Sequence, residues 1–398
     1  MMKFFTNRAR ITIHPQKTSI NIYNTPKIEL DHLKSSQPWE VNKVKVPVGE
    51  EFTHLGIDFN MSSYNATATT TIDNRLQRGR TTTYSLMGAG LHGINGLKAT
   101  ATIHMYKVYV LPRMLYGLEA IAINPGNMTR LEVSNRSLLR DIQGLPKRTA
   151  IPALHILSGM LTMEALIDKK RLTSIPSMTR NPSLYNIIHR QVAVKTVKSS
   201  SWTIKTQAIL HKYGLPHIVD VARWQPEKES WKKLVDQAIE RHWKAIIEDE
   251  GKSKSSLKFL NPTFTANSTH FIWDTTSTDS REVRRATIKA RMLAGVYILQ
   301  YNRAVFNQTH STLCLMCEEA EEDLPHFLVG CKAMDHIRKL LLDEIMDLIP
   351  WVMENHPSRG WESSLLAQII LDLTLSRVVE ILPLQRTDML RIERVDRK

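Results

Sequence analysis

Hydrophobic and polar positions alternate in the first sixty residues and take a helical spacing afterwards. Around Pro15 the alternation predicts short strands, with apolar positions at Ile11, Ile13, Ile20 and Ile22. The segments KVKVPVG (43–49) and FTHLGIDFN (52–60) predict further β structure. From about Ala66 the spacing indicates helices. We therefore expect a mainly α protein with a small N-terminal β part, an α+β class in the broad sense.

The segment TRLEVSNRSLLRDIQGLP at 129–146 gives the clearest helical pattern. Thr129 and Glu132 match a capping box, which predicts the start of the helix. The residues that follow share one apolar face, at Leu131, Leu138 and Ile142, with Asn135 between them. Gly144 and Pro146 predict its end. A second helical run covers 103–121, where we expect Pro112 to kink or divide the helix.

The remaining segments divide the chain. Residues 181–200 are polar and irregular, which predicts a boundary. Further helices are expected at 231–251, at 281–303, from Met334 to Pro350 and at 363–382, with a flexible basic connector at 251–258. We predict four domains: a β-containing segment at 1–65, a helical domain at 66–185, a helical linker or connection region at 186–305, and a cysteine-containing segment with flanking helices at 306–398.

Charge is distributed unevenly along the chain. The net charge is +14, and residues 61–180 carry 15 Lys and Arg against 6 Asp and Glu. The residues after 180 carry 30 against 27 and are nearly neutral as a whole. Basic charge concentrated on a folded segment suits a polyanion, because phosphate contacts release counterions. A basic surface that only keeps the protein in solution is the alternative.

All three cysteines lie within eighteen residues, in the spacing Cys314-x2-Cys317-x8-His326-x4-Cys331. A Cys-x-x-Cys turn can present two thiolates to one metal ion and direct backbone N–H groups at the sulfurs, and zinc takes four Cys or His ligands in a tetrahedron. Four protein ligands close the site, so we predict a structural zinc with no catalytic role. The alternative is three buried cysteines and a histidine that bind no metal.

The spacing of the last two ligands constrains the backbone. His326 and Cys331 are five residues apart, about 140° around a regular helix, so they do not share one helical face. We expect the chain to bend between them, at Gly330, and Asp323 to cap a turn that begins at Pro325. Without the ion, the four ligand atoms should lie within about 4 Å of one another.

Cellular location is constrained only weakly. No apolar run reaches the eighteen residues that indicate a membrane span, and the first residues have too short an apolar patch for a signal peptide. We expect no membrane partner and an intracellular location, either nuclear or cytoplasmic. An odd, clustered set of cysteines also argues against a disulfide framework.

Several short motifs, taken in order, resemble the C-terminal portion of LINE-type (non-LTR) retrotransposon reverse transcriptases. The matching elements are Tyr116-Gly117, Leu131-Glu132, Leu139-Arg140 and Gly144-Leu145-Pro146, which resemble the region after the polymerase core. Upstream, Lys17-Thr18 and His54-Leu55-Gly56-Ile57 look like the palm Lys-Thr element and the primer-grip hairpin. Downstream, the Cys314–Cys331 segment is similar to the knuckle of the family. The resemblance covers most of 8–180 and 310–335.

The resemblance implies a partial palm with primer grip at 1–65, a nucleic-acid-binding thumb at 66–185 and a zinc knuckle near the C-terminus. The family's polymerase holds its metal ions with aspartates that should precede Lys17, and no Asp-Asp pair occurs in this chain. We therefore expect that this chain alone extends no primer and needs no catalytic magnesium. A working polymerase would require a partner chain that supplies the aspartates.

The expected partner is RNA or an RNA–DNA hybrid, bound through its backbone without sequence preference. The candidate phosphate contacts are Lys17, Arg75, Arg78, Arg80, Lys98, Lys107, Arg113, Lys147 and Arg148. For each of them the alternative is an ordinary solvated charge. The alternative function is a zinc-stabilised helical protein-interaction module without a nucleic-acid role, which the acidic stretch EEAEED at 318–323 favours because it repels phosphate.

Overall fold

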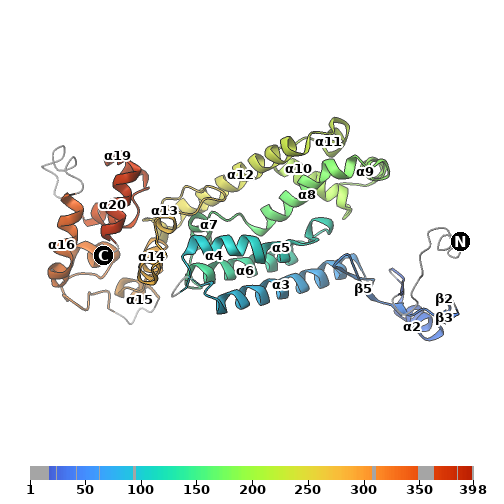
Figure 1. Cartoon of the computed structure of the whole chain (residues 1–398), viewed down its shortest axis with the longest axis horizontal. Coiled ribbons are helices and arrows are strands. Elements are labelled where there is room, and N and C mark those ends of the chain that lie inside the picture. Colours follow the sequence, from blue (N-terminus) through green and yellow to red (C-terminus); the bar gives the residue numbers. More distant parts are fainter. Residues whose placement is uncertain are drawn as a thin grey trace. The chain divides into compact units, whose positions relative to one another are not determined.

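The chain is mainly helical, and its strands are short and lie toward the N-terminus (Figure 1). The computed structural model describes residues 18–23, 25–41, 43–61, 63–92, 96–306, 311–347, 363–382 and 384–396. This distribution confirms the predicted fold class. The expected strand positions Ile11 and Ile13, and the candidate phosphate contact Lys17, lie outside the described residues.

The chain forms two compact units, each built from three separate segments. Unit 1 comprises Met1–Gly79, Pro112–Glu132 and Lys170–Lys228. Unit 2 comprises Arg80–Leu111, Val133–Lys169 and Glu229–Lys398. The four consecutive domains expected from the sequence are a different division of the chain and stay a prediction.

The strands of the described N-terminal part pair two by two. Strand β1 (Ile20–Asn21) runs parallel to β4 (Val48–Gly49). The other two pairs are antiparallel: β2 (Glu40–Val41) with β3 (Val44–Lys45), and β5 (Glu51–His54) with β6 (Ile57–Asn60). Helix α2 (Lys27–Ser36) separates β1 from the others.

The hairpin expected at 52–60 is confirmed as β5–β6. Its two turn residues, Leu55 and Gly56, both have positive φ, at 49° and 76°, which suits the twist of a two-residue hairpin. Tyr116 Oη donates a hydrogen bond of 2.8 Å to the Leu55 carbonyl and so holds this turn. The next residue, Gly117, has φ 79°, and a Cβ there would lie 2.8 Å from Ile57. Tyr116 therefore holds the hairpin turn by a hydrogen bond, and the absence of a side chain at Gly117 leaves space for the Ile57 side chain.

Unit 1 also contains the first part of α3 (Tyr64–Gly88) and a group of short helices. These are α5 (Leu111–Leu115), η3 (Leu118–Ala120), the second half of α8 (Met163–Thr179), α9 (Pro182–Val194), α10 (Trp202–Lys212) and α11 (Ile218–Trp224). Helices α9, α10 and α11 contact one another. The buried Arg171 ties α8 to η3, since its guanidinium donates to the carbonyls of Glu119 and Ile121.

Unit 2 holds most of the helices described. They are the last parts of α3 and α6 (Pro125–Gln143), the first part of α8, α4 (Ala99–Met105), η2 (Tyr106–Val110), α7 (Ile151–Ser158), α12 (Lys228–Ser253), η4 (Ser255–Leu257), α13 (Phe271–Asp274), α14 (Ser280–Leu293), α15 (Gln300–Phe306), η5 (His326–Gly330), η6 (Lys332–Met334), α16 (Asp335–Asp347), α18 (Ser363–Leu371), α19 (Ser376–Ile381) and α20 (Arg386–Asp396). The last four of these pack around one apolar cluster, at Ile345, Ile369, Leu373, Val378, Leu382 and Ile392.

Helix α6 confirms the predicted apolar face but not the predicted start. Leu131, Leu138 and Ile142 are buried, and the buried Asn135 accepts a hydrogen bond of 2.8 Å from Tyr106 Oη. The expected capping box at Thr129 is wrong, because the helix begins at Pro125 and the Asn124 side chain accepts from the Asn127 N–H. The predicted stop is confirmed, since Gly144 follows the helix with φ 65°.

The region around Pro112 stays helical through a wider turn. Residues 106–110 form a π-helical turn, in which the Leu111 N–H bonds to the Tyr106 carbonyl five residues earlier. Proline donates no hydrogen bond and its ring crowds the carbonyl four residues before it. A π turn placed directly before Pro112 changes the hydrogen-bonding register at that point. The predicted interruption is therefore a change of helical winding.

Several predicted boundaries are wrong for identifiable reasons. The segment expected to be irregular at 181–200 contains α9, which Asn181 caps. The helix expected at 281–303 is divided into α14 and α15 at Gly295, whose φ is 64°. Helix α12 runs through Gly251 to Ser253, and the expected flexible connector contains the buried Leu257. The helix expected at 363–382 is two helices, α18 and α19. The expected stop at Pro350 lies outside the described residues.

Candidate metal centre

A tight turn places the first two cysteines together. Leu313 pairs with Glu321 in an antiparallel bridge, and the Cys314 N–H donates to the Ala320 carbonyl at 2.8 Å. The Glu318 N–H then donates to the Cys314 carbonyl at 2.9 Å, and Glu318 takes a left-handed φ of 57°. The chain reverses over a few residues, so that Cys314 and Cys317 face the same point.

A capped turn brings His326 to that point. The Asp323 carboxylate accepts a hydrogen bond of 2.8 Å from the His326 N–H, and the Phe327 N–H donates to the Asp323 carbonyl. The predicted capping role of Asp323 is confirmed. The turn contacts the connection between α14 and α15, because the rings of Phe327 and Tyr297 have centroids 5.9 Å apart.

A π-helical turn brings together the last two ligand candidates, His326 and Cys331, which are five residues apart. Residues His326–Gly330 form η5, and the Cys331 N–H donates to the His326 carbonyl at 2.8 Å. A turn closed by a bond between residues five apart brings those residues near one another, which a regular α-helix does not. The expected departure from a regular helix between His326 and Cys331 therefore takes the form of a π turn. Gly330 ends the π turn, and Cys331 follows in an extended conformation.

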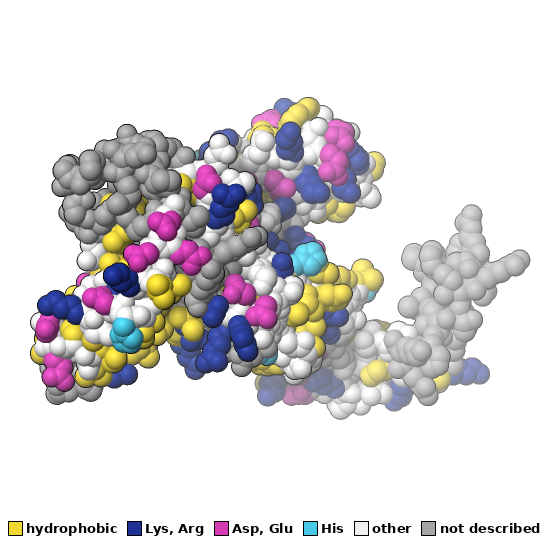
Figure 2. Space-filling view, turned by 60° about the vertical axis from the view of Figure 1, so that its left-hand side comes forward, with side chains coloured by type: hydrophobic (Ala, Val, Ile, Leu, Met, Phe, Trp, Pro, Cys, Tyr) yellow, Lys and Arg dark blue, Asp and Glu magenta, His cyan; other side chains and the backbone are white. Residues whose placement is uncertain are grey.

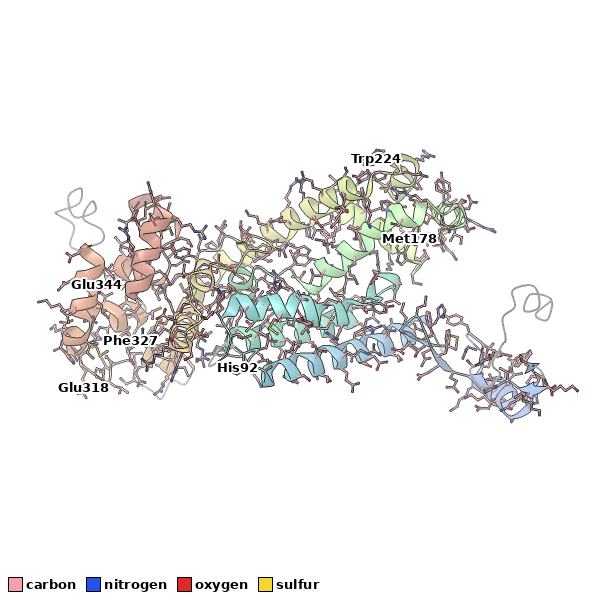
Figure 3. All side chains as sticks on the ribbon, in the orientation of Figure 1. His92, Met178, Trp224, Glu318, Phe327 and Glu344 are labelled. Atoms are coloured by element: carbon pink, nitrogen blue, oxygen red, sulfur yellow. The ribbon has the colours of Figure 1, made fainter. Side chains whose placement is uncertain are left out.

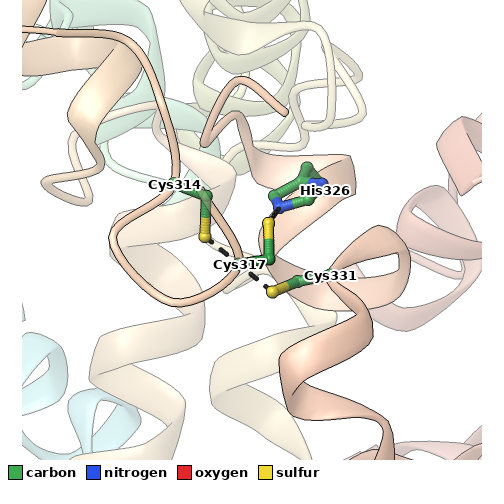
Figure 4. Close-up of side chains that lie close together, drawn as sticks. All are labelled: Cys314, Cys317, His326 and Cys331. Carbon is green, nitrogen blue, oxygen red and sulfur yellow. Dashed lines mark hydrogen bonds between the residues drawn. The ribbon is translucent and has the colours of Figure 1, made fainter. Parts of the chain in front are cut away.

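The four side chains converge in the way a metal ion requires (Figure 4). Cys314 Sγ lies 3.8 Å from Cys331 Sγ, and Cys317 Sγ lies 3.4 Å from His326 Nε2. All four ligand atoms lie within 4.8 Å of one another. A zinc tetrahedron with Zn–S bonds of about 2.3 Å has S–S edges of about 3.8 Å. The cluster is somewhat looser than the expected limit of about 4 Å, and an inward movement of about 1 Å closes it.

Backbone N–H groups point at all three sulfurs. Cys314 Sγ accepts from the Met316 N–H at 3.4 Å. The N–H groups of Glu319 and Ala320 reach Cys317 and lower the pKa of its thiol. Burial raises the pKa of the Cys331 thiol, while the Ala333 N–H acts in the opposite direction. In each case the residue two positions after the cysteine donates, and such donors stabilise thiolates more than neutral thiols.

Interactions around the cluster hold it against the helices that follow it within unit 2. Arg338, on α16, donates from its guanidinium to the Cys331 carbonyl and to the Asp335 carboxylate. Lys332 forms an exposed ion pair of 3.1 Å with Glu319. The η5 turn also contacts α18. The ligand positions therefore depend on helices that follow the cysteines in the sequence.

The predicted phosphate contacts are distributed over both units. Arg75, Arg78 and Arg113 belong to unit 1, and the others described belong to unit 2, at Arg80, Lys98, Lys107, Lys147 and Arg148. Exposed members are Arg78, Arg80, Arg113, Lys147 and Arg148, whereas Lys98 and Lys107 are half-buried. Burial lowers the pKa of Lys107. Arg148 also donates to the Val296 carbonyl at 2.5 Å.

Arg75 is removed from the set of phosphate contacts. Its side chain is only 1% exposed. The guanidinium donates to the Gly56 carbonyl and lies over the Tyr116 ring, 5.0 Å from the ring centroid. Burial, followed by the charge of Arg78, lowers the pKa of Arg75. The prediction for this residue was wrong because the arginine supports the β5–β6 turn from inside.

Comparison of the chain with protein-family models, with curated proteins and with solved structures finds no match. Among the described residues, no single helix has the length and apolar character to cross a membrane, and one bent pair, α7 with α8, meets those criteria only when the two are taken together.

Proposed function

We propose that Cys314, Cys317, His326 and Cys331 hold a structural zinc ion. The convergence of four ligand atoms, with a backbone donor to each sulfur, carries the proposal. Three thiolates and an imidazole are a donor set that zinc prefers, and four protein ligands leave no position for a substrate. The ion's contribution is folding free energy, because it links the turn at Cys314 to the π turn before Cys331.

Zinc content tests this assignment. Protein purified without chelator should contain about one zinc per chain, and Cys317→Ser or His326→Asn should lose it. His336→Asn is the matched control, since His336 is exposed on the adjacent α16 and is not a member of the cluster. Chelation should remove hydrogen-exchange protection near 311–334 and leave protection at α4 and α6 intact. Wild-type protein with zinc well below one per chain would remove the site.

We propose further that the chain binds nucleic acid, as the resemblance to the C-terminal portion of non-LTR reverse transcriptases implies. The supporting observation is the net charge of +9 over residues 61–180, with Arg78, Arg80, Arg113 and Lys147 exposed. The ligand is RNA or an RNA–DNA hybrid, bound weakly through phosphates. The proposal assigns no catalytic magnesium to this chain.

Salt dependence tests nucleic-acid binding. Affinity for an RNA–DNA hybrid should fall steeply as salt rises, and Arg78→Glu with Arg80→Glu should lower both the affinity and the slope. Lys232→Glu with Lys233→Glu on α12 is the control, because those two lysines are also exposed on one helix but lie outside 61–180. No binding by the wild-type protein at low salt would refute the proposal.

A protein-interaction module is the second candidate, and the exposed apolar tip of the knuckle favours it. Leu315 is 69% exposed and Met316 is 60% exposed, between the two first cysteines. The acidic residues Glu318 and Glu319 follow directly. An apolar tip with an acidic rim repels phosphate and suits a basic protein segment. Zinc content near one together with absent nucleic-acid binding would select this function.

A further inference from the structure

Unit 1 contains a strongly basic segment, residues 170–219. The nearly neutral total of the residues after 180 does not show this local excess of positive charge. Residues 170–219 contain eight Lys and Arg and no Asp or Glu. Residues 220–260 contain nine Lys and Arg against eight Asp and Glu. The two segments have nearly equal numbers of cations, but only the first contains no carboxylate side chain of its own. On the face drawn in Figure 2, by contrast, basic and acidic side chains are interspersed.

Part of this charge is used inside the fold, and four cations are not. Lys170 pairs with Glu119, Arg171 is buried, and Arg180 donates to the Pro226 carbonyl. Four further cations are exposed: Arg190, Lys195, Lys198 and Lys205. In the described part of the chain, their side chains have no hydrogen-bond or ion-pair partner. They lie on α9, on the connection after it and on α10, helices that contact each other.

An exposed apolar stripe runs along the same helix. Leu184, Ile187 and Val194 fall within an arc of about 80° on α9, and all three are exposed. Val197, just beyond the helix, is 88% exposed. Ile188, which is buried, lies about 40° from Leu184, so the stripe borders the buried side of α9. Within unit 1, no other described residue buries these side chains. The ligand of this surface must therefore offer both negative charge and apolar groups.

We propose that this surface, consisting of the four cations and the four apolar residues, binds a single-stranded stretch of nucleic acid. The inference rests on the proposed function for the class of ligand and locates it on residues outside 61–180. Phosphates contact the cations, and unpaired bases lie on the aliphatic stripe. A duplex presents phosphates but hides its base faces in the stack, so it uses the cations alone. Trp224, 60% exposed on the neighbouring α11, is a further base-stacking platform in unit 1 (Figure 3).

Charge neutralisation with a matched control tests the cations. The variant Arg190→Gln, Lys195→Gln, Lys198→Gln, Lys205→Gln should bind a single-stranded RNA oligonucleotide about tenfold more weakly at low salt. Its log–log salt slope should fall by about 3, since each lost phosphate contact on a single strand removes about 0.7. The control replaces Lys228, Lys232, Lys233 and Lys244 of α12 by Gln, where carboxylates compensate the charge. It should leave the slope unchanged.

A second variant tests the stripe. Ile187→Ser with Val194→Ser should weaken binding of the single strand and leave binding of a duplex of the same length unchanged. Both residues are exposed, so circular dichroism should show a folded protein. Equal losses for single strand and duplex would overturn the assignment to unpaired bases. Tighter binding to anionic lipid vesicles than to RNA, lost in the same variants, would overturn it in favour of a membrane surface.

The two proposals fail in different ways. If the wild-type protein binds neither single-stranded nor duplex nucleic acid, the proposed function fails and this inference fails with it. If the wild-type protein binds, and the four-cation variant keeps its affinity and slope while the Arg78 and Arg80 variant loses them, the proposed function stands and this surface is overturned.

Discussion

Acidification should destabilise unit 2 through one buried histidine. His155, on α7, is buried, and its Nδ1 lies 2.7 Å from the Met160 carbonyl oxygen. Its Nε2 is buried without a hydrogen-bond partner among the described residues. Burial lowers the pKa of His155 to about 4, the bond to Met160 opposes this, and the positive charges of Arg136 and Arg140 lower the pKa further. Protonation at Nε2 would place an unpaired cation inside unit 2.

The magnitude follows from proton linkage. An unfolded histidine titrates near pH 6.5, and the folded value is about 4. Between these values the unfolded chain binds more protons, so stability falls as the pH falls through this window and is fully present above it. The complete loss is about 3.4 kcal/mol, and about 2.6 kcal/mol of it is lost at pH 4.5. That is a large fraction of the usual stability of a protein domain.

The assay is urea unfolding of wild type and His155→Leu at pH 7 and at pH 4.5. The difference in unfolding free energy between the two proteins should change by about 2.6 kcal/mol in favour of the variant at the lower pH. The effects of pH on all other titrating groups occur in both proteins and cancel in this difference. His336→Leu, at an exposed position on α16, is the control and should show no such change. An unchanged difference for His155→Leu would refute the reasoning.

Two further substitutions test close packing in unit 2. Gly159 has φ 62°, and a Cβ there would lie 2.1 Å from the Ser268 carbonyl oxygen. Gly159→Ala should therefore lower the free energy of urea unfolding by more than about 2 kcal/mol. The control Gly214→Ala, with φ 64° and open space around it, should lower it by about 1 kcal/mol, and equal losses would contradict this reasoning. Asp372 is buried, and although burial raises its pKa, the charge and hydrogen bond of His270 lower it overall. Asp372→Asn removes acceptor capacity, so melting should show a loss of about 1–3 kcal/mol, and an unchanged melting temperature would contradict this role.

The candidate metal ligands were predictable from the sequence because they are close in sequence and their chemistry is specific. The three cysteines and His326 converge as expected, and Asp323 caps the turn between them. The π turn was not predictable from the 100° periodicity of an α-helix, since the bond between Cys331 and His326 depends on the winding that the whole knuckle adopts. Residue identity therefore indicated the ligand set, and packing determined the path of the backbone.

Helix boundaries were less predictable, although one local signal was present. Asn124-Pro125 and Asn181-Pro182 both form a cap followed by proline in the first turn, the usual start of a helix. The first was overlooked in favour of a capping box at Thr129, and the second lies in a segment expected to be irregular. Helix α9 has apolar residues at Leu184, Ile187, Ile188 and Val194, but the polar residues that follow Val194 gave the whole segment 181–200 an irregular composition.

A glycine in the sequence did not by itself predict where a helix ends, because its role depends on the residues that pack against it. Gly251 was expected to end a helix, yet it lies inside α12, where a Cβ would be 3.3 Å from Ile156. Gly295 was expected inside a helix, yet it ends α14, and a Cβ there would lie 2.2 Å from the Ser256 carbonyl oxygen. Both positions depend on residues far away in the sequence, which the pattern of apolar positions does not contain.

Charge is the property for which counting along the sequence misleads most, because a side chain's role depends on its nearest partners. Arg75, on α3, contributes to the basic total of 61–180, but its guanidinium donates to the Gly56 carbonyl in the β5–β6 turn. Arg190 and Lys195 contribute to a half of the chain that is neutral as a whole, yet no described carboxylate pairs with them. The field that a polyanion meets is set by cations that are both exposed and uncompensated over a distance of about 8–10 Å, the Debye length near physiological salt. Arg190, Lys195, Lys198 and Lys205 are exposed and have no described ion-pair partner, so they contribute to that field more directly than a larger sum in which opposite charges alternate.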